Sequence, residues 1–167
     1  AVYPAYAGGR AYYATCRGAC DATDDYQVVR FDTDGTVDDA MLALDANGRP
    51  HVLLSTFSSV YYATCAGDCA DPSSWTTTQI VKHDGKRDVT GEAFALDANG
   101  HPRFLMHTYV AYLGIGQDEP ETDWVACDDD CGNPASWSVS KISDQIWRSS
   151  TLRFDATGRA LVSTSAM

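Results

Sequence analysis

Carboxyl groups are the most numerous reactive side chains of this 167-residue chain, which has 23 Asp and Glu residues against 12 Lys and Arg. Glycoside hydrolysis uses two carboxyl groups about 5–10 Å apart. Glu92, Asp39, Glu119 and Glu121 lie in or beside segments that we expect to be loops. The sequence does not show which of them would meet, and it lacks the Gly-x-Ser-x-Gly turn of serine hydrolases. A carbohydrate-active enzyme with carboxylates from different repeats is therefore an alternative hypothesis.

Four aspartates close together in the chain are candidate calcium ligands, because that ion prefers oxygen. They are Asp32, Asp34, Asp38 and Asp39. Their spacing does not match the EF-hand pattern, so a solvated turn is the simpler interpretation. We expect no cofactor, with calcium as the weaker alternative.

Aromatic side chains make a better case for ligand binding than for catalysis, because sugars stack on such rings and protein partners use them as anchors. The alternative is that these rings pack inside the protein. The residues that we assign to a ligand site are Trp147, Trp124, Tyr109, Tyr112, His107, Arg148 and Glu92.

The six cysteines form three C-x3-C pairs, which are Cys16 with Cys20, Cys65 with Cys69 and Cys127 with Cys131. Such regular, even pairing is typical of local disulfides and an oxidising compartment. Zinc is the rival interpretation, but zinc sites usually have a second pair nearby. We expect disulfides, and a secreted, periplasmic or cell-surface protein.

The cysteine pairs belong to a repeat. An aromatic residue stands six positions after each second cysteine, at Tyr26, Trp75 and Trp137. A second repeated segment, LALDANGRPHVLL in its first full copy, has two apolar runs around an Asn-Gly turn and predicts a β-hairpin. The Asp of each such turn is expected to bond its own backbone. Each repeat then has four antiparallel strands, and no segment shows helical periodicity.

The LDANGxP and YYATCxxxC…W units resemble the degenerate β-propeller repeats of secreted bacterial proteins, distantly related to sialidase-type blades. The resemblance implies an all-β propeller fold of the six-bladed type and an extracellular setting, and it implies no single activity. The sialidase Asp-box, Ser-x-Asp-x-Gly-x-x-Trp, is absent. We expect one half-propeller domain over 1–167, with blade units at about 38–82, at 90–142, and at 149–167 joined to 1–31.

Three blades do not readily close a ring, because propellers typically have four to eight. We therefore expect either a head-to-tail homodimer or a segment of a longer propeller, whose remaining blades lie on a second chain or outside this sequence. A self-closed or non-propeller sheet is the remaining possibility.

The formal net charge of −11 and the pI near 4.5 disfavour nucleic acid and anionic membranes as partners. No apolar run reaches the roughly 18 residues of a membrane span. The first hypothesis is a binding or assembly module, with a glycan or a protein bound on the loops that join second to third strands and one repeat to the next. A structural subunit completed by a partner chain is a third hypothesis.

Overall fold

The computed structural model describes residues 1–5, 9–83, 87–110 and 120–165 of the chain. The described strands are β1 (Val2–Ala5), β2 (Arg10–Cys16), β3 (Tyr26–Asp32), β4 (Val37–Leu44), β5 (Pro50–Thr56), β6 (Ser59–Cys65), β7 (Trp75–Lys82), β8 (Arg87–Leu96), β9 (Pro102–Val110), β10 (Glu121–Cys127), β11 (Trp137–Ser143), β12 (Arg148–Phe154) and β13 (Ala160–Ser165). The helices described are three single 3-10 turns, η1 (Thr23–Asp25), η2 (Pro72–Ser74) and η3 (Pro134–Ser136). None of them is long or apolar enough to cross a membrane.

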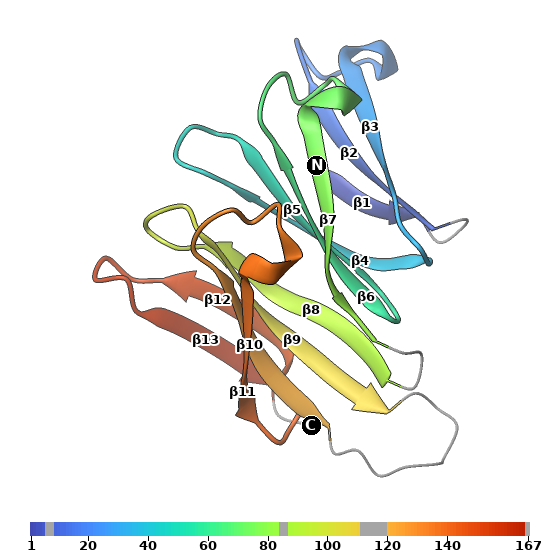
Figure 1. The fold of residues 1–167 in the computed structure, drawn as a ribbon. Helices are drawn as coiled ribbons and strands as arrows, with labels where there is room; N and C mark the ends of the chain where they lie inside the picture. Colours follow the sequence, from blue (N-terminus) through green and yellow to red (C-terminus); the bar gives the residue numbers. More distant parts are fainter. Residues whose placement is uncertain (6–8, 84–86, 111–119, 166–167) are drawn as a thin grey trace.

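The strands form four antiparallel sheets that follow one another along the chain, as Figure 1 shows. Strands β1–β2–β3 form the first sheet, β4–β5–β6–β7 the second, β8–β9–β10–β11 the third and β12–β13 the fourth. Strand β4 lies beside β1 and β8, and β8 lies beside β12, so the first strands of successive sheets are neighbours. The all-β antiparallel fold expected from the sequence is confirmed.

The Asp-containing hairpin turns are built alike in three places. Oδ1 of Asp45 accepts hydrogen bonds from the backbone N–H groups of Asn47 and Arg49, both at 2.8 Å. Asp97 and Asp155 make the same pair of bonds in their own turns. Because these carboxylates hold backbone donors, the structural role predicted for them is confirmed.

Each cysteine pair closes a disulfide at the loop between the last two strands of a sheet. The aromatic residue six positions later donates a hydrogen bond to the carbonyl of the second cysteine, at 3.0 Å for Tyr26, Trp75 and Trp137 alike. The disulfides predicted from spacing are confirmed, and they indicate an oxidising compartment.

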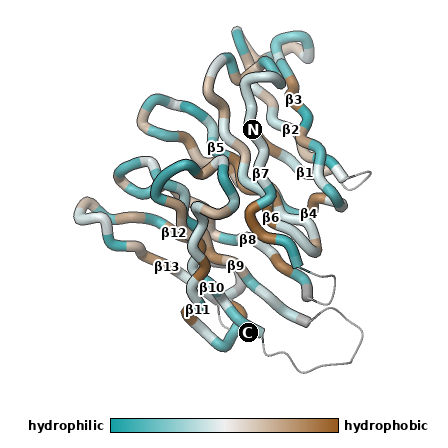
Figure 2. Tube along the Cα trace, in the orientation of Figure 1, coloured by the Kyte–Doolittle hydropathy of each residue, from teal (hydrophilic) through white to brown (hydrophobic). Residues whose placement is uncertain are grey.

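The hydrophobic core lies between sheets. The Trp75 ring packs against Tyr13 and Phe31 of the preceding sheet, with ring centroids 4.9 Å apart in both cases. Trp137 packs likewise against Tyr62 of its preceding sheet, at 5.1 Å. Separate apolar clusters fill the three sheet–sheet junctions. Figure 2 shows that the chain is most hydrophilic at the turns and loops that join the strands.

The described sheets do not close into a ring. The first sheet and the β12–β13 hairpin lie at opposite ends of the row, with the two four-stranded sheets between them (Figure 1). The sheets thus form an open row, in which both end sheets have fewer strands than the middle ones.

Candidate functional site

A group of interacting carboxyl side chains lies on the neighbouring first strands β4 and β8. It comprises Asp38, Asp39, Asp88 and Glu92, which we call the carboxyl row. Asp38 interacts electrostatically with Asp39 and Asp88, and Asp39 interacts with Glu92. Two adjacent sheets therefore contribute to one group of like charges.

Local irregularities place these side chains. The β4–β5 register shifts between Val37 and Asp39, so Asp38 is the extra residue of a β-bulge. In β8 the register shifts after Glu92, where Ala93 has a φ of +52°. A non-glycine residue in this left-handed region is uncommon, and such backbone concentrates at functional sites.

A glycine lets the third sheet approach the second closely. The Gly91 N–H donates to Oγ of Ser55 at 2.9 Å. A Cβ atom on Gly91 would lie 2.8 Å from Cδ2 of Leu53, closer than carbon atoms tolerate. This contact brings Glu92 to the edge of β4.

Burial favours the protonated forms of Asp38, Asp39 and Asp88. Burial raises the pKa of Asp38 to about 6. A hydrogen bond to the backbone of Asp38 itself lowers this pKa, and the negative charges of Asp39 and Asp88 raise it further. Burial also raises the pKa of Asp39, with repulsion from Glu92 adding to it, and burial raises the pKa of Asp88. Oδ1 of Asp38 is buried and has no hydrogen-bond partner among the described residues. Below about pH 6 the row can therefore offer a carboxylic acid donor at Asp38 beside carboxylate acceptors.

A buried histidine adjoins the row. Nδ1 of His107, on β9, lies 3.1 Å from Oε1 of Glu92, and the His107 side chain is only 2% exposed. Its Nε2 is buried without a hydrogen-bond partner in the part of the chain that the structure describes. Unpaired buried polar atoms of native proteins usually mark a water, an ion or a functional role.

Beyond the histidine, Asp123 on β10 is buried. Burial raises its pKa and Glu121 raises it further, while the positive charge of Lys141 and of His83 opposes the shift. His107 also acts on Asp123 electrostatically, so interacting titratable groups extend across the third sheet from β8 to β10.

A hollow of about 430 Å³ runs along the same strands, immediately beyond the row. It is lined by 41–44 of β4, by 93–96 of β8 and by 151–153 of β12. Most of its lining residues have apolar side chains, with Arg153 as the charged one, but the surface exposed in the hollow is more polar than apolar. The site therefore combines a half-buried group of acids with an adjacent hollow of mixed polarity.

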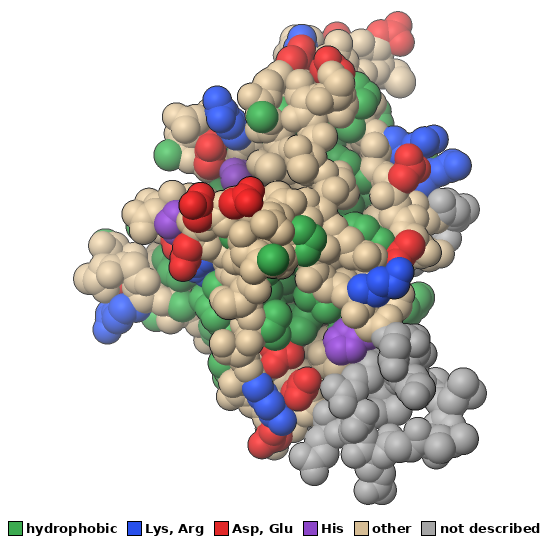
Figure 3. All heavy atoms as spheres, in the orientation of Figure 1, with side chains coloured by type: hydrophobic (Ala, Val, Ile, Leu, Met, Phe, Trp, Pro, Cys, Tyr) green, Lys and Arg blue, Asp and Glu red, His purple; other side chains and the backbone are tan. Residues whose placement is uncertain are grey.

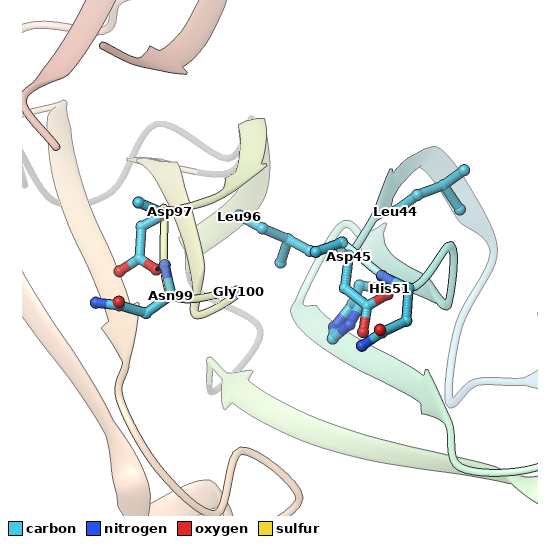
Figure 4. Close-up of a pocket in the computed structure, with 10 residues that line it drawn as sticks. Leu44, Asp45, His51, Leu96, Asp97, Asn99 and Gly100 are labelled. Atoms are coloured by element: carbon cyan, nitrogen blue, oxygen red, sulfur yellow. Dashed lines mark hydrogen bonds between the residues drawn. The ribbon is translucent and has the colours of Figure 1, made fainter. Parts of the chain in front are cut away.

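A second hollow, of about 310 Å³, lies between two hairpin turns. Figure 4 shows Asp45 and His51 on one side, Asp97 and Asn99 on the other, and Leu96 between them. Because both aspartates are bonded to their own turns, this hollow offers few free polar groups.

The predicted aromatic residues differ in their surroundings. Trp124 and Trp147 pack partly buried in the apolar cluster between the third sheet and β12–β13, where Trp124 meets Phe154 edge-on at 6.5 Å. Tyr109 is half-buried on β9, and its backbone pairs with Asp88. Tyr112 and the side chain of Arg148 lie outside the described part of the structure, as does Glu119.

The four candidate calcium ligands take different partners. Asp32 forms an ion pair with Arg30 at 2.9 Å. Asp34 accepts from Tyr61 at 2.5 Å and from Gln79 at 2.9 Å; burial would raise its pKa, but these bonds together with Lys82 lower it. Asp38 and Asp39 belong to the carboxyl row. Among the described residues, no group of three or more His, Cys, Asp or Glu side chains is placed to hold a metal ion.

Sequence reasoning identified Glu92, Asp39 and His107 and missed Asp88 and Asp123 as members of the same region. Asp88 lies between basic and β-branched residues, and Asp123 lies inside a strand, so no local motif marks either of them. The signal that could have found Asp88 is its place at the start of β8, the strand equivalent to the one that carries Asp38 and Asp39.

No protein-family model, no curated protein and no solved structure matches this chain. Function is therefore inferred from the carboxyl row, the hollow beside it and the arrangement of the sheets.

Proposed function

We propose that this chain is a secreted or cell-surface binding module that holds a glycan across the carboxyl row and the adjoining hollow. The observation that carries the proposal is the meeting of half-buried carboxyl groups from β4 and β8 beside the buried, partly unpaired His107. Sequence alone suggested a glycan or a protein as the ligand; the glycan is the better match to this chemistry.

A glycan suits the site because carboxylates accept hydrogen bonds from sugar hydroxyls, and the adjoining hollow exposes both polar and apolar surface. A phosphorylated or otherwise anionic ligand would meet strong repulsion, since the chain has a formal net charge of −11. On the face seen in Figure 3, acidic side chains are interspersed with Lys and Arg side chains.

The proposal includes the architecture that presents the ligand. We infer that the sheets are blades of a β-propeller, because each full sheet repeats the same four-stranded order, the same disulfide loop and the same aromatic contact with the preceding sheet. In that arrangement the first strands β4, β8 and β12 line the central axis, which is where the row and the hollow lie.

A glycan array followed by titration calorimetry tests the binding function. The double variant Asp39→Asn with Glu92→Gln removes two of the row's four carboxyl groups, one from each sheet, while keeping the side-chain shapes, and we expect at least a tenfold loss of affinity. The control is Asp21→Asn, which removes an acidic charge from an exposed position directly after the first disulfide. Equal binding by the row variant and the control, or the absence of any array hit, would contradict the proposal.

A second candidate function, glycoside hydrolysis, is favoured by one specific observation. Asp39 and Glu92 come from different sheets and interact, and Asp38 next to them has a pKa raised to about 6 by burial, as a general acid requires. Hydrolysis would then fall as the pH rises above about 6, where Asp38 loses its proton. Release of reducing sugar from an array hit, reduced about 10²- to 10⁴-fold in Asp38→Asn, would establish it. Binding without turnover would leave the chain a binding module.

A further inference from the structure

The hollow of about 310 Å³ between the first two Asp-containing turns, which we call the turn hollow, has a counterpart of similar size. The counterpart, of about 300 Å³, lies between the second and third of these turns and is lined by 95–98 and 152–155. The turn hollow is lined by 44–47, 51 and 96–100. Because the repeat produces two similar hollows, the residues that differ between them show what is particular to each.

In two of the three turns an arginine occupies the second oxygen of the aspartate. Oδ2 of Asp97 accepts a hydrogen bond from Nη2 of Arg103 at 2.8 Å, and Oδ2 of Asp155 accepts one from Nε of Arg159 at 2.7 Å. Both aspartates also hold their own backbone through Oδ1. The counterpart hollow, which both of them line, is therefore bordered by carboxylates that are already paired.

Asp45 of the turn hollow lacks such a partner. Its Oδ1 holds the turn, but none of the described Arg and Lys residues forms an ion pair with its Oδ2, and His51 stands at the place of Arg103. Hydrogen bonds from the backbone of Arg49 and from the backbone and side chain of Asn47 lower the pKa of Asp45, which keeps it ionised at neutral pH. An ionised carboxylate has about four acceptor positions, so Asp45 can accept a further hydrogen bond.

His51 supplies a donor in the same hollow. Burial lowers the pKa of His51, although the charge of Asp45 opposes the shift, so the ring is neutral at pH 7. Burial raises the pKa of Tyr62 to about 12, and the bond from Thr64 lowers it, as a donor to the phenol oxygen does. The Tyr62 proton is then directed to Nδ1 of His51, 2.5 Å away. The proton of the neutral ring is therefore on Nε2, which is open to solvent and has no hydrogen-bond partner among the described residues.

Apolar side chains complete the turn hollow. Leu44, at the end of β4, is 58% exposed, and Leu96 of β8 projects between the two turns (Figure 4). The hollow thus exposes polar and apolar surface in similar amounts. Its volume is at the lower end of the range for ligand pockets, so it suits a ligand about as large as one sugar ring.

We propose that the turn hollow is a second binding site, for one hydroxyl-rich ring of a neutral saccharide. A sugar hydroxyl both donates and accepts, so it can donate to Oδ2 of Asp45 and accept from Nε2 of His51. An ammonium group has no acceptor and would leave the His51 donor unpaired, while an anionic group would be repelled by Asp45. The C–H face of the ring packs on Leu44 and Leu96. The turn hollow contains no residue of the carboxyl row, so the inference does not depend on the function proposed above.

Amide chemical-shift mapping of the nitrogen-15-labelled chain tests the site, with glucose, galactose, mannose and N-acetylglucosamine as probes. At least one of these sugars should shift the resonances of 44–51 and 96–100 at millimolar concentration, the range expected for so small a polar ligand. The same spectra report whether each variant is folded.

His51→Arg introduces the residue of the third sheet, which should pair with Asp45 and reduce the affinity by about tenfold or more. His101→Arg is the matched control, because position 101 does not line the turn hollow and the other two turns have Arg49 and Arg159 there. It should bind as the wild type does.

Asp45→Asn keeps one oxygen for the turn and removes the charge, so it should also weaken binding by about tenfold. Asp155→Asn makes the same change in a turn that does not line this hollow, and it should leave the affinity unchanged.

Two results would overturn the inference: no shift of 44–51 by any of the four sugars, or equal losses of affinity in His51→Arg and His101→Arg. A sugar that shifts only 38–39 and 88–92 would support the carboxyl row and overturn the second site. Shifts at the turns that persist in the double variant Asp39→Asn with Glu92→Gln would support the turn hollow independently of the row. A response of the turn hollow to methylammonium and to none of the sugars would overturn the neutral saccharide as its ligand.

Discussion

Oε1 of Glu92 lies 3.1 Å from Nδ1 of His107, and it is the hydrogen-bonding partner that the structure provides for this buried ring. The two residues come from neighbouring strands of the third sheet, and Glu92 also faces Asp39 of the second sheet. Glu92 thus interacts both with a buried residue of its own sheet and with a residue of the neighbouring sheet. Substitutions at Glu92 should therefore change the stability of the fold as well as ligand binding.

Glu92→Ala should lower the free energy of unfolding by about 1–3 kcal/mol, because it leaves both nitrogens of the buried His107 ring without partners. Glu92→Gln keeps a hydrogen-bonding side chain at the same length and should lose less. Urea titrations at neutral pH measure the difference. Equal losses for the two variants would show that His107 does not depend on this partner.

Asp38→Asn should stabilise the protein at pH 7 and not at pH 4. The pKa of Asp38 is raised from 3.8 to about 6, so the folded state binds this proton more tightly than the unfolded state. Wild-type stability from this group is therefore greatest at low pH and falls as the pH rises from about 4 to about 6. The expected gain at pH 7 is about 1 kcal/mol, because solvent screens a half-exposed carboxyl group.

Thermal unfolding at several pH values checks this expectation. Asp21→Asn, at an exposed position, should follow the wild-type profile at every pH. If the unfolding temperatures of Asp38→Asn and the wild type differed by the same amount at every pH from 4 to 7, the assigned pKa shift would be contradicted.

The contribution of the aromatic residue after each disulfide to the free energy of unfolding should depend on whether its ring packs against a preceding sheet. Trp137→Ala removes a ring that packs against Tyr62 and Phe104, and should cost about 3 kcal/mol. Tyr26→Ala removes the equivalent but exposed ring and should cost about 1 kcal/mol or less in the monomer. Chemical denaturation measures both losses.

The repeats explain how much of this structure could be predicted from sequence. The C-x3-C pairs and the Asp-x-x-Gly turns recur at near-constant spacing, and each is a local motif whose geometry depends on residues within a few positions. The disulfides, the hairpins and the packing of Trp75 and Trp137 followed from them.

The carboxyl row could be predicted only in part. Glu92, His107 and Asp39 were recognised as candidates, but their meeting depends on a bulge at Asp38 and on the sheet–sheet approach at Gly91, which no local pattern marks. Trp124 and Trp147 were candidates because of their loop-proximal positions, and the structure packs both beside β12–β13. Long-range packing of this kind depends on which sheets become neighbours, and sequence periodicity does not contain that information.

Gly91→Ala should separate the second and third sheets and weaken the site. The new Cβ would lie 2.8 Å from Cδ2 of Leu53 and 3.3 Å from Oγ of Ser55. Leu53 is fully buried, so its side chain has little room to move, and we expect a loss of about 1–3 kcal/mol in the free energy of unfolding. Gly132→Ala is the matched control, because its Cβ would meet only Thr76 at an ordinary 3.8 Å. Leu53→Val in the Gly91→Ala background should recover part of the loss, and the double-mutant cycle measures that coupling. Additive losses would mean that the cost of Gly91→Ala arises from the backbone of β8 and not from the contact between the two sheets.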